Sequence, residues 1–206
     1  MAEFDLAAMR IRERYRVLTT VIAPRPIAFV SSLDGAGRGN LAPFSCFGMG
    51  GNNPVSCIVC PITMRDGTDK DTTRNILETG EYVINIVTRE MAERMNRASF
   101  TYARGDDEFD RAGFTRASSR RVRPPRVAES PAHLECRLFQ TVRHGEGPGA
   151  SVYLVGEVLH VGVDDAACTD GVPDNRKLEQ LARLGGDWYL SVRPEQLFEM
   201  PRPTEP

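Results

Sequence analysis

Residues 24–47, PRPIAFVSSLDGAGRGNLAPFSCF, decide the fold because they hold two extended segments separated by a turn. The run IAFVSSL at 27–33 is apolar and partly β-branched, which predicts a strand. The glycine-rich stretch that begins at Asp34 predicts an exposed, bent loop. Pro43 interrupts the second segment, and proline cannot donate to a strand ladder, so we expect this segment at the edge of a sheet.

Four more segments with strand character follow along the chain. They are VSCIVCPI at 55–62, EYVINIV at 81–87, HLECRLFQTV at 133–142 and SVYLVGEVLHVGV at 151–163. With IAFVSSL and the second extended segment, NLAPFSCFGMGGNNP at 40–54, they make six. Short strands cut by turn residues are typical of barrels and sandwiches, so the sequence predicts a closed or nearly closed six-stranded sheet.

Helices are predicted to be fewer and shorter than strands. The candidates are 70–80 (KDTTRNILETG), 89–99 (REMAERMNRAS), 107–113 (DEFDRAG) and 176–186 (RKLEQLARLGG). We expect Asp71 to cap the first helix and Gly80 to end it. Residues 116–133 are rich in Arg, Ser and Pro and predict an extended surface arm, whose arginines are solvated or serve a dimer contact or an anion site.

Length and composition bound the class of protein. A chain of 206 residues with 41% hydrophobic and 26% charged residues predicts one globular domain, 1–206. The formal net charge of −2 gives no basic field to attract nucleic acid, which we do not expect as a partner. The N-terminus lacks the pattern of a secretion signal, and no apolar run approaches the roughly 20 residues of a membrane span. A cytoplasmic protein without a membrane partner is therefore expected.

The cysteines and histidines offer no clear metal or redox motif. Five cysteines without a secretion signal indicate reduced thiols. Cys57 and Cys60 form a CxxC, but residues three apart on a strand face opposite ways, so we interpret them as core thiols. His133 and Glu135 share one face of a predicted strand, and without a further ligand cluster we interpret this stretch as structural.

A set of small polar residues is the remaining candidate for chemistry. Ser31 and Ser32 end the first strand, while Asn40 and Ser45 lie on the second segment. At 70–72, Lys-Asp-Thr opens a helix, where free backbone N–H groups, a hydroxyl and a cation suit a phosphate monoester. The alternative is a well-capped surface helix beside ordinary turn and strand residues, and these residues alone leave both open.

The order of these motifs resembles the flavin reductase-like proteins with an FMN-binding split barrel. The resemblance rests on 24–47, on KDTTRNILETGEYVINIV at 70–87, on DEFDRAGFT at 107–115, on VRPPRVAESPAHLEC at 122–136 and on VYLVGEVLHV at 152–161. It spans roughly Tyr15 to Tyr189 and is strongest toward the flavoredoxin-like branch, which RLGGDWYL at 183–190 resembles.

This resemblance implies a six-stranded Greek-key split barrel, a homodimer, and FMN in a groove near the subunit interface. It implies that backbone groups of two strands run along the flavin and that the phosphate meets the helix start. The cofactor-binding residues implied are Ser31, Ser32, Asn40, Leu41, Ala42, Ser45, Cys46, Phe47, Lys70, Asp71 and Thr72. No catalytic side chain and no metal are implied.

The resemblance also implies an activity, with one departure. Many NADH-dependent members carry Gly-Asp-His before the strand at 152–161, and the matching residues here are Gly149, Ala150 and Ser151. We expect an FMN-dependent oxidoreductase. The leading hypothesis is an NAD(P)H:flavin reductase that supplies reduced flavin or electrons to a partner monooxygenase or another electron acceptor. The alternatives are a flavoprotein that holds FMN and does not use NADH or NADPH, and a scaffold without redox work. For Trp188 and Tyr189 the sequence leaves three roles open: they cover the flavin, they contact the dimer partner, or they are core aromatics.

Overall fold

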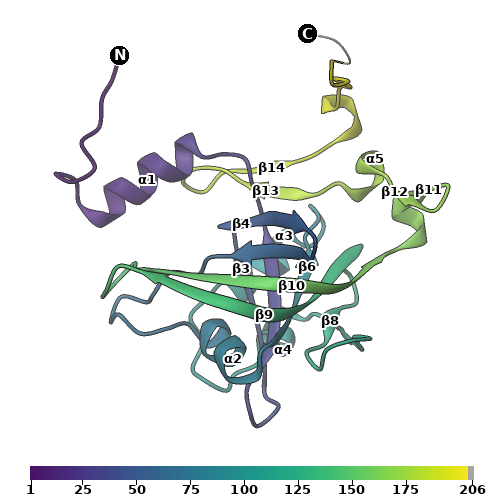
Figure 1. The fold of residues 1–206 in the computed structure, drawn as a ribbon, viewed down its shortest axis with the longest axis horizontal. Helices are drawn as coiled ribbons and strands as arrows, with labels where there is room; N and C mark the ends of the chain where they lie inside the picture. Colours follow the sequence, from purple (N-terminus) through teal and green to yellow (C-terminus); the bar gives the residue numbers. More distant parts are fainter. Residues whose placement is uncertain (204–206) are drawn as a thin grey trace.

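The computed structural model describes residues 1–203 and is built around one large antiparallel sheet (Figure 1). Its strands lie in the order β3-β2-β6-β9-β10-β5-β4. Their bounds are β2 (Ala28–Leu33), β3 (Gly39–Phe44), β4 (Phe47–Asn52), β5 (Val55–Val59), β6 (Glu81–Ile86), β9 (Ala132–His144) and β10 (Ser151–Val163). The mainly β class predicted from the sequence is confirmed.

The main sheet has seven strands, so the predicted count of six is wrong. The segment at 40–54 breaks at Ser45 and Cys46 into β3 and β4. These two strands are consecutive in the chain yet form the two opposite edges of the sheet. The sheet is therefore open where β3 ends and β4 begins, and Pro43 lies on an edge strand as predicted.

Three small sheets accompany the large one. They contain β1 (Arg25–Pro26), β13 (Leu181–Arg183) and β14 (Tyr189–Ser191); β7 (Arg116–Ala117) and β8 (Arg126–Val127); and β11 (Cys168–Thr169) and β12 (Val172–Pro173). Residues 181–183 correct the predicted helix at 176–186, of which only α5 (Asn175–Leu178) forms. Pairing of β13 with β1 and β14 outweighs the local helical pattern.

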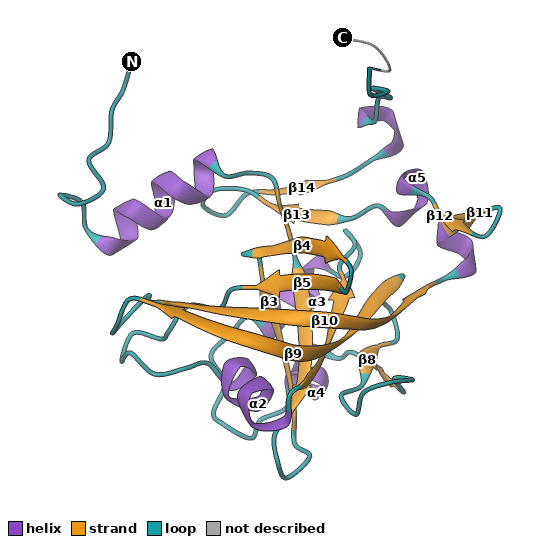
Figure 2. Cartoon of the chain, in the orientation of Figure 1, coloured by secondary structure: helices purple, strands orange, loops and turns teal. Residues whose placement is uncertain are grey.

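Three other predicted helices are present. They are α2 (Asp71–Thr79), α3 (Ala92–Ala98) and α4 (Glu108–Ala112), and Figure 2 shows them beside the sheet. Gly80 ends α2 and Gly113 ends α4, each with a positive φ that a side chain would strain. No helix in residues 1–203 is both long enough and apolar enough to cross a membrane.

The core lies on both faces of β2 because side chains alternate along a strand. Phe29 points into a cluster with Met91, Met95 and Phe114, and its ring meets that of Phe114 edge-on at 5.1 Å between centroids. Val30 points to the other face, into a second cluster formed within the main sheet. The first cluster anchors α3 and α4 against β3, and these elements carry the groove described below.

Helix α1 (Ile11–Val21) was not predicted from the sequence, and it projects from the body of the molecule (Figure 1). Thr19 is its one buried residue. Ile11, Tyr15 and Leu18 are exposed, and Ile22 continues the row just past the helix end. Spacings of four, three and four residues place them on one face, so α1 carries an uncovered apolar stripe.

Candidate functional site

A groove runs along the free edge of β3 and past the start of α2. Its inner part has a volume of about 90 Å³ and is lined by Asn40, Ala42, Pro43, Phe44, Met64, Lys70, Asp71, Thr72, Ala98, Ser99, Phe100, Thr101, Tyr102 and Glu108. Met64, Lys70 and Thr101 also line an outer hollow of about 590 Å³ around 62–66. Together the two hollows have the size of a small-molecule site, for which about 300–1,000 Å³ is usual.

The start of α2 presents positive charge to this groove. Lys70 occupies the N-cap position, and no side chain within residues 1–203 accepts a hydrogen bond there. The expectation that Asp71 caps the helix is wrong, because Asp71 is the first helical residue and pairs with Arg74 at 2.5 Å and Arg104 at 3.0 Å. The first backbone N–H groups of α2 therefore stay available, and the aspartate charge is compensated by two guanidinium groups. Such a helix start attracts anions.

Lys70 is a cation that forms no ion pair within the described part of the chain, whereas Asp69 beside it is held by Arg143 at 2.5 Å. Arg65, which lines the outer hollow, likewise has no ion pair among these residues. Among the 26 basic residues, Lys70 and Lys177 are the lysines. A lysine ammonium on a flexible stem can follow an anion bound at the helix start.

Two side-chain hydrogen bonds fix the edge of β3 to the helices around it. The amide of Asn40 donates to the hydroxyl of Thr72 at 2.7 Å, which ties β3 to α2 and buries Thr72. The backbone N–H of Leu41 donates to the carboxylate of Glu108 at 2.9 Å, which ties β3 to α4. One main-chain donor of the edge is thus already used, and the edge is rigid on its groove side.

Glu108 has an unusual environment for a carboxyl group in this groove. Burial raises its pKa above the ordinary value, although the N–H of Leu41 acts in the opposite direction. Phe100 and Tyr102 also line the groove, and their rings form an edge-on pair with centroids 5.0 Å apart. The groove therefore combines a positive end with an apolar and partly aromatic side.

The raised pKa of Glu108 makes stability depend on pH. A carboxyl with a folded pKa above its unfolded value binds more protons when folded, so stability is lost as the pH rises through the interval between the two values. Glu108→Gln keeps an acceptor for the Leu41 N–H and cannot ionise. We expect its melting temperature, relative to the native chain, to rise between pH 4 and pH 8. Parallel scans of both proteins across this range test it, and a constant difference would contradict it.

The structure brings five of the predicted residues to the groove and places the others apart. Those in the groove are Asn40, Ala42, Lys70, Asp71 and Thr72. Ser31 is buried and donates to the carbonyl of Pro125, and Ser32 accepts from Asn75 at 3.3 Å. Leu41 is a core residue that reaches this region through its backbone.

The remaining three predicted residues lie at the junction of β3 and β4. Ser45 accepts from the Arg25 guanidinium at 3.4 Å, Cys46 is exposed, and Phe47 packs against the core of the sheet. They border the opening of the main sheet rather than the groove beside α2.

Sequence reasoning missed Met64, Phe100, Tyr102 and Glu108 as groove residues. Glu108 lies within DEFDRAGFT, which carried the resemblance, but nothing in its spacing relates it to β3. Phe100 and Tyr102 follow α3 in a segment without periodicity, so no local pattern marks them.

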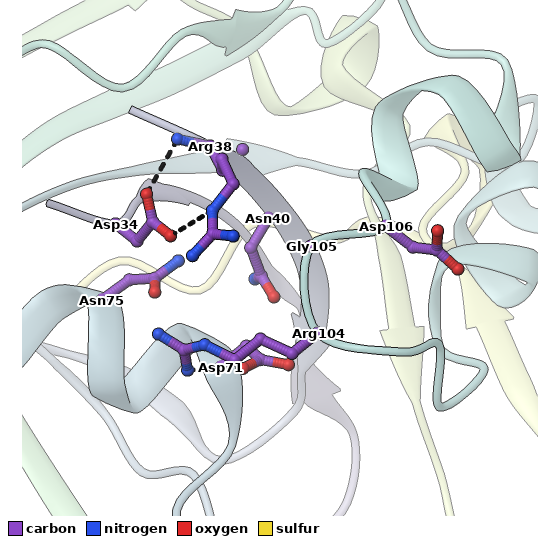
Figure 3. A pocket seen from close by; sticks show the side chains of 9 residues that line it. Asp34, Arg38, Asn40, Asp71, Asn75, Arg104, Gly105 and Asp106 are labelled. Carbon is purple, nitrogen blue, oxygen red and sulfur yellow. Dashed lines mark hydrogen bonds and ion pairs between the residues drawn. The ribbon is translucent and has the colours of Figure 1, made fainter. Parts of the chain in front are cut away.

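A small cavity shares Asn40 and Asp71 with the groove (Figure 3). Asp34, Arg38, Asn75 and Arg104 are among its lining residues, and its volume is about 10 Å³, room for roughly one water molecule. The Asp34 carboxylate accepts from the Arg38 guanidinium at 2.7 Å, as the dashed lines show. This ion pair stabilises the loop before β3. The cavity is too small for an organic ligand.

A second polar cluster lies away from the groove, on β9 and β10. His133 and Glu135 share a face of β9 as predicted, but His160 of β10 joins them, which the sequence reading missed. Burial raises the pKa of Glu135, yet the N–H groups of Arg120 and Arg121 outweigh it, so the pKa is below its ordinary value. Burial lowers the pKa of His133, and the charge of Arg126 adds to this.

The prediction of two core thiols is confirmed for Cys57 and wrong for Cys60. Cys57 is buried and Cys60 lies past the end of β5, half-buried. The neighbour of Cys57 is Cys136, with 3.9 Å between the sulfur atoms, and both lie close to Tyr82.

Comparison with known proteins identifies relatives along nearly the whole chain. Residues 21–182 match the family described as "Flavin reductase like domain". An uncharacterized protein of Deinococcus radiodurans is 37% identical, with 98% of this chain and 89% of that protein covered.

Solved structures share this architecture. Nitrilotriacetate monooxygenase component B from Bacillus cereus has a TM-score of 0.90 and 29% identity, over 97% of this chain and 98% of that one. A candidate flavin reductase with a split barrel domain from Shewanella frigidimarina has a TM-score of 0.82 and 26% identity, over 98% and 100%. The fold is accordingly similar to a split barrel, with its opening between β3 and β4.

Proposed function

The chain belongs to the flavin reductase like domain family, and from that premise we propose that it is an FMN-dependent NAD(P)H:flavin reductase. In this proposal it passes reduced flavin or electrons to a monooxygenase or another acceptor. The observation that carries it is the groove along β3, which ends at the uncapped start of α2 and at Lys70, a cation without an ion pair in residues 1–203.

The groove fits FMN in its charges and its walls. Lys70 and the first N–H groups of α2 would hold the phosphate, and the pairing of Asp71 with Arg74 and Arg104 removes the repulsion that a lone carboxylate would cause. Phe100 and Tyr102 offer apolar surface for the ring system. These features support a phosphorylated flavin over riboflavin.

When bound, FMN supplies hydride and single-electron chemistry, and the protein holds the flavin in place relative to its reaction partner. We infer that β3 holds the flavin against its backbone edge, with Asn40 and Glu108 keeping that edge rigid through Thr72 and Leu41. No side chain need act as acid or base. Backbone N–H groups that face the flavin would stabilise negative charge that develops on it. On β3 the N–H of Leu41 is already bound to Glu108 and Pro43 has none.

Two features bear on the donor and the acceptor. The similarity to a protein named as component B of a monooxygenase supports an oxygenase as the acceptor. Ser151 stands where many NADH-dependent members have histidine, which favours the second candidate: a flavoprotein that holds FMN and does not use NADH or NADPH.

We further propose a homodimer, with the apolar stripe of α1 covered by the partner. Ile11, Tyr15, Leu18 and Ile22 are otherwise exposed together. Replacing Leu18 with Arg is expected to shift the chain from dimer to monomer, while Arg12→Ala, on another face of the helix, leaves the dimer intact. Sedimentation analysis measures this, and a native chain that is monomeric at all concentrations contradicts it.

The decisive experiment on function is an anaerobic titration of the FMN-loaded protein. NADH and NADPH are added separately, and loss of the oxidised flavin absorbance is followed. The proposal expects rapid bleaching with one of them. If neither bleaches the flavin while dithionite does, the second candidate stands and the reductase proposal fails.

A further inference from the structure

Two histidines and a glutamate converge between β9 and β10, outside the groove. The register pairs His160 with Glu135 across the two strands, and His133 lies two residues before Glu135 on the same face. One ring nitrogen of each histidine and a carboxylate oxygen of Glu135 all lie within 4.8 Å of one another.

The distances in this cluster are unusual for hydrogen bonds. Glu135 Oε1 is 3.6 Å from His133 Nε2 and 3.4 Å from His160 Nδ1. Ligands about 2.0–2.1 Å from a tetrahedral ion stand roughly 3.3–3.4 Å apart, so both spacings suit a shared ion. A direct hydrogen bond would normally be 2.7–3.2 Å long.

Burial and packing also favour ion binding by this cluster. His160 Nδ1 is buried and has no hydrogen-bond partner among the described residues, and Glu135 is 0% exposed. A Cβ at Gly162 would lie 2.2 Å from the His133 ring, so this glycine leaves the space that the ring fills. The unpartnered nitrogen therefore faces a buried carboxylate, in a site where the two histidine side chains keep partial exposure.

Glu135 is already fixed by the backbone. Its two oxygens accept from the N–H of Arg120 at 2.9 and 3.0 Å, and one of them from the N–H of Arg121 at 2.5 Å. A ligand held from behind in this way has little freedom left to lose on binding an ion. Arg126 adds a positive charge near His133, which opposes the binding of any cation, whereas the two imidazoles favour transition-metal ions over Ca²⁺ and Mg²⁺.

We propose that His133, Glu135 and His160 bind one divalent transition-metal ion of the zinc type. The ion ties β9 to β10 and, through Glu135, to the loop at 120–121. The site is structural and independent of the proposed flavin chemistry.

The test uses untagged, chelator-treated native protein titrated calorimetrically with ZnCl₂. We expect one zinc ion per chain and a higher melting temperature with zinc. His160→Leu removes no hydrogen bond made by His160 Nδ1 within residues 1–203, so the variant should fold. It is expected to bind zinc at least about 100-fold more weakly. His144→Leu is the matched control, since His144 is an exposed histidine at the end of β9, and it should bind like the native chain.

Two results would overturn the proposal. One is the absence of zinc binding by the native chain. The other is undiminished binding by His160→Leu, which would point to the thiols instead. X-ray absorption at the zinc edge of the native protein gives a second readout that needs no variant: nitrogen and oxygen ligands are expected, and sulfur ligands contradict the site.

Discussion

Lys70→Ala is expected to bind FMN about 10- to 100-fold more weakly than the native chain. A charge-assisted hydrogen bond contributes about 1–3 kcal/mol, and each 1.4 kcal/mol is a factor of about ten in affinity. The loss should depend on the phosphate, because Lys70 stands at the start of α2 with no ion-pair partner in residues 1–203. Fluorescence titration with FMN and with riboflavin measures both affinities.

The matched control for this prediction is Lys177→Ala. Lys177 lies on α5, where it donates to the carbonyl of Cys168, and it does not line the groove. Its replacement should leave FMN affinity unchanged. The phosphate position would be refuted if Lys70→Ala bound FMN as tightly as Lys177→Ala, or if riboflavin and FMN lost affinity equally.

Glu135→Ala is expected to destabilise the fold by roughly 2–5 kcal/mol. The substitution removes the hydrogen bonds that the backbone N–H groups of Arg120 and Arg121 donate to this carboxylate, and a hydrogen bond to a charged group contributes about 1.5–3 kcal/mol. In a chain of this size the melting temperature should fall by about 5–20 °C. The measurement is made with chelator present, so that bound metal contributes nothing.

Glu157→Ala provides the comparison for stability. Glu157 lies on β10, is partly exposed and forms no ion pair within residues 1–203, so its loss should change stability by about 0.5 kcal/mol or less. A melting temperature for Glu135→Ala close to that of Glu157→Ala would show that the loop at 120–121 is not held by this carboxylate.

Local sequence patterns predicted those elements whose tertiary contacts favour the same secondary structure as the local sequence does. The apolar stretch of β2 and the glycine Gly80 that ends α2 each have a local physical reason, and each appears as expected. The resemblance to a family then supplied the approximate place of the site, which spacing alone could not.

Features that depend on distant pairing were not predictable from the sequence in this way. Leu181 lies in a helical pattern but forms a strand because β1 and β14 lie beside it. The segment at 40–54 divides because its two halves join opposite edges of the sheet. Glu108 reaches Leu41 and His160 reaches Glu135 only through tertiary structure.

The most direct test of the central claim is a crystal structure of the chain with FMN. Our account predicts the phosphate at hydrogen-bonding distance from Lys70 Nζ and the first N–H groups of α2, with the flavin ring along β3 and facing Phe100 or Tyr102. FMN bound elsewhere, or a groove that stays empty at saturating FMN, would contradict it.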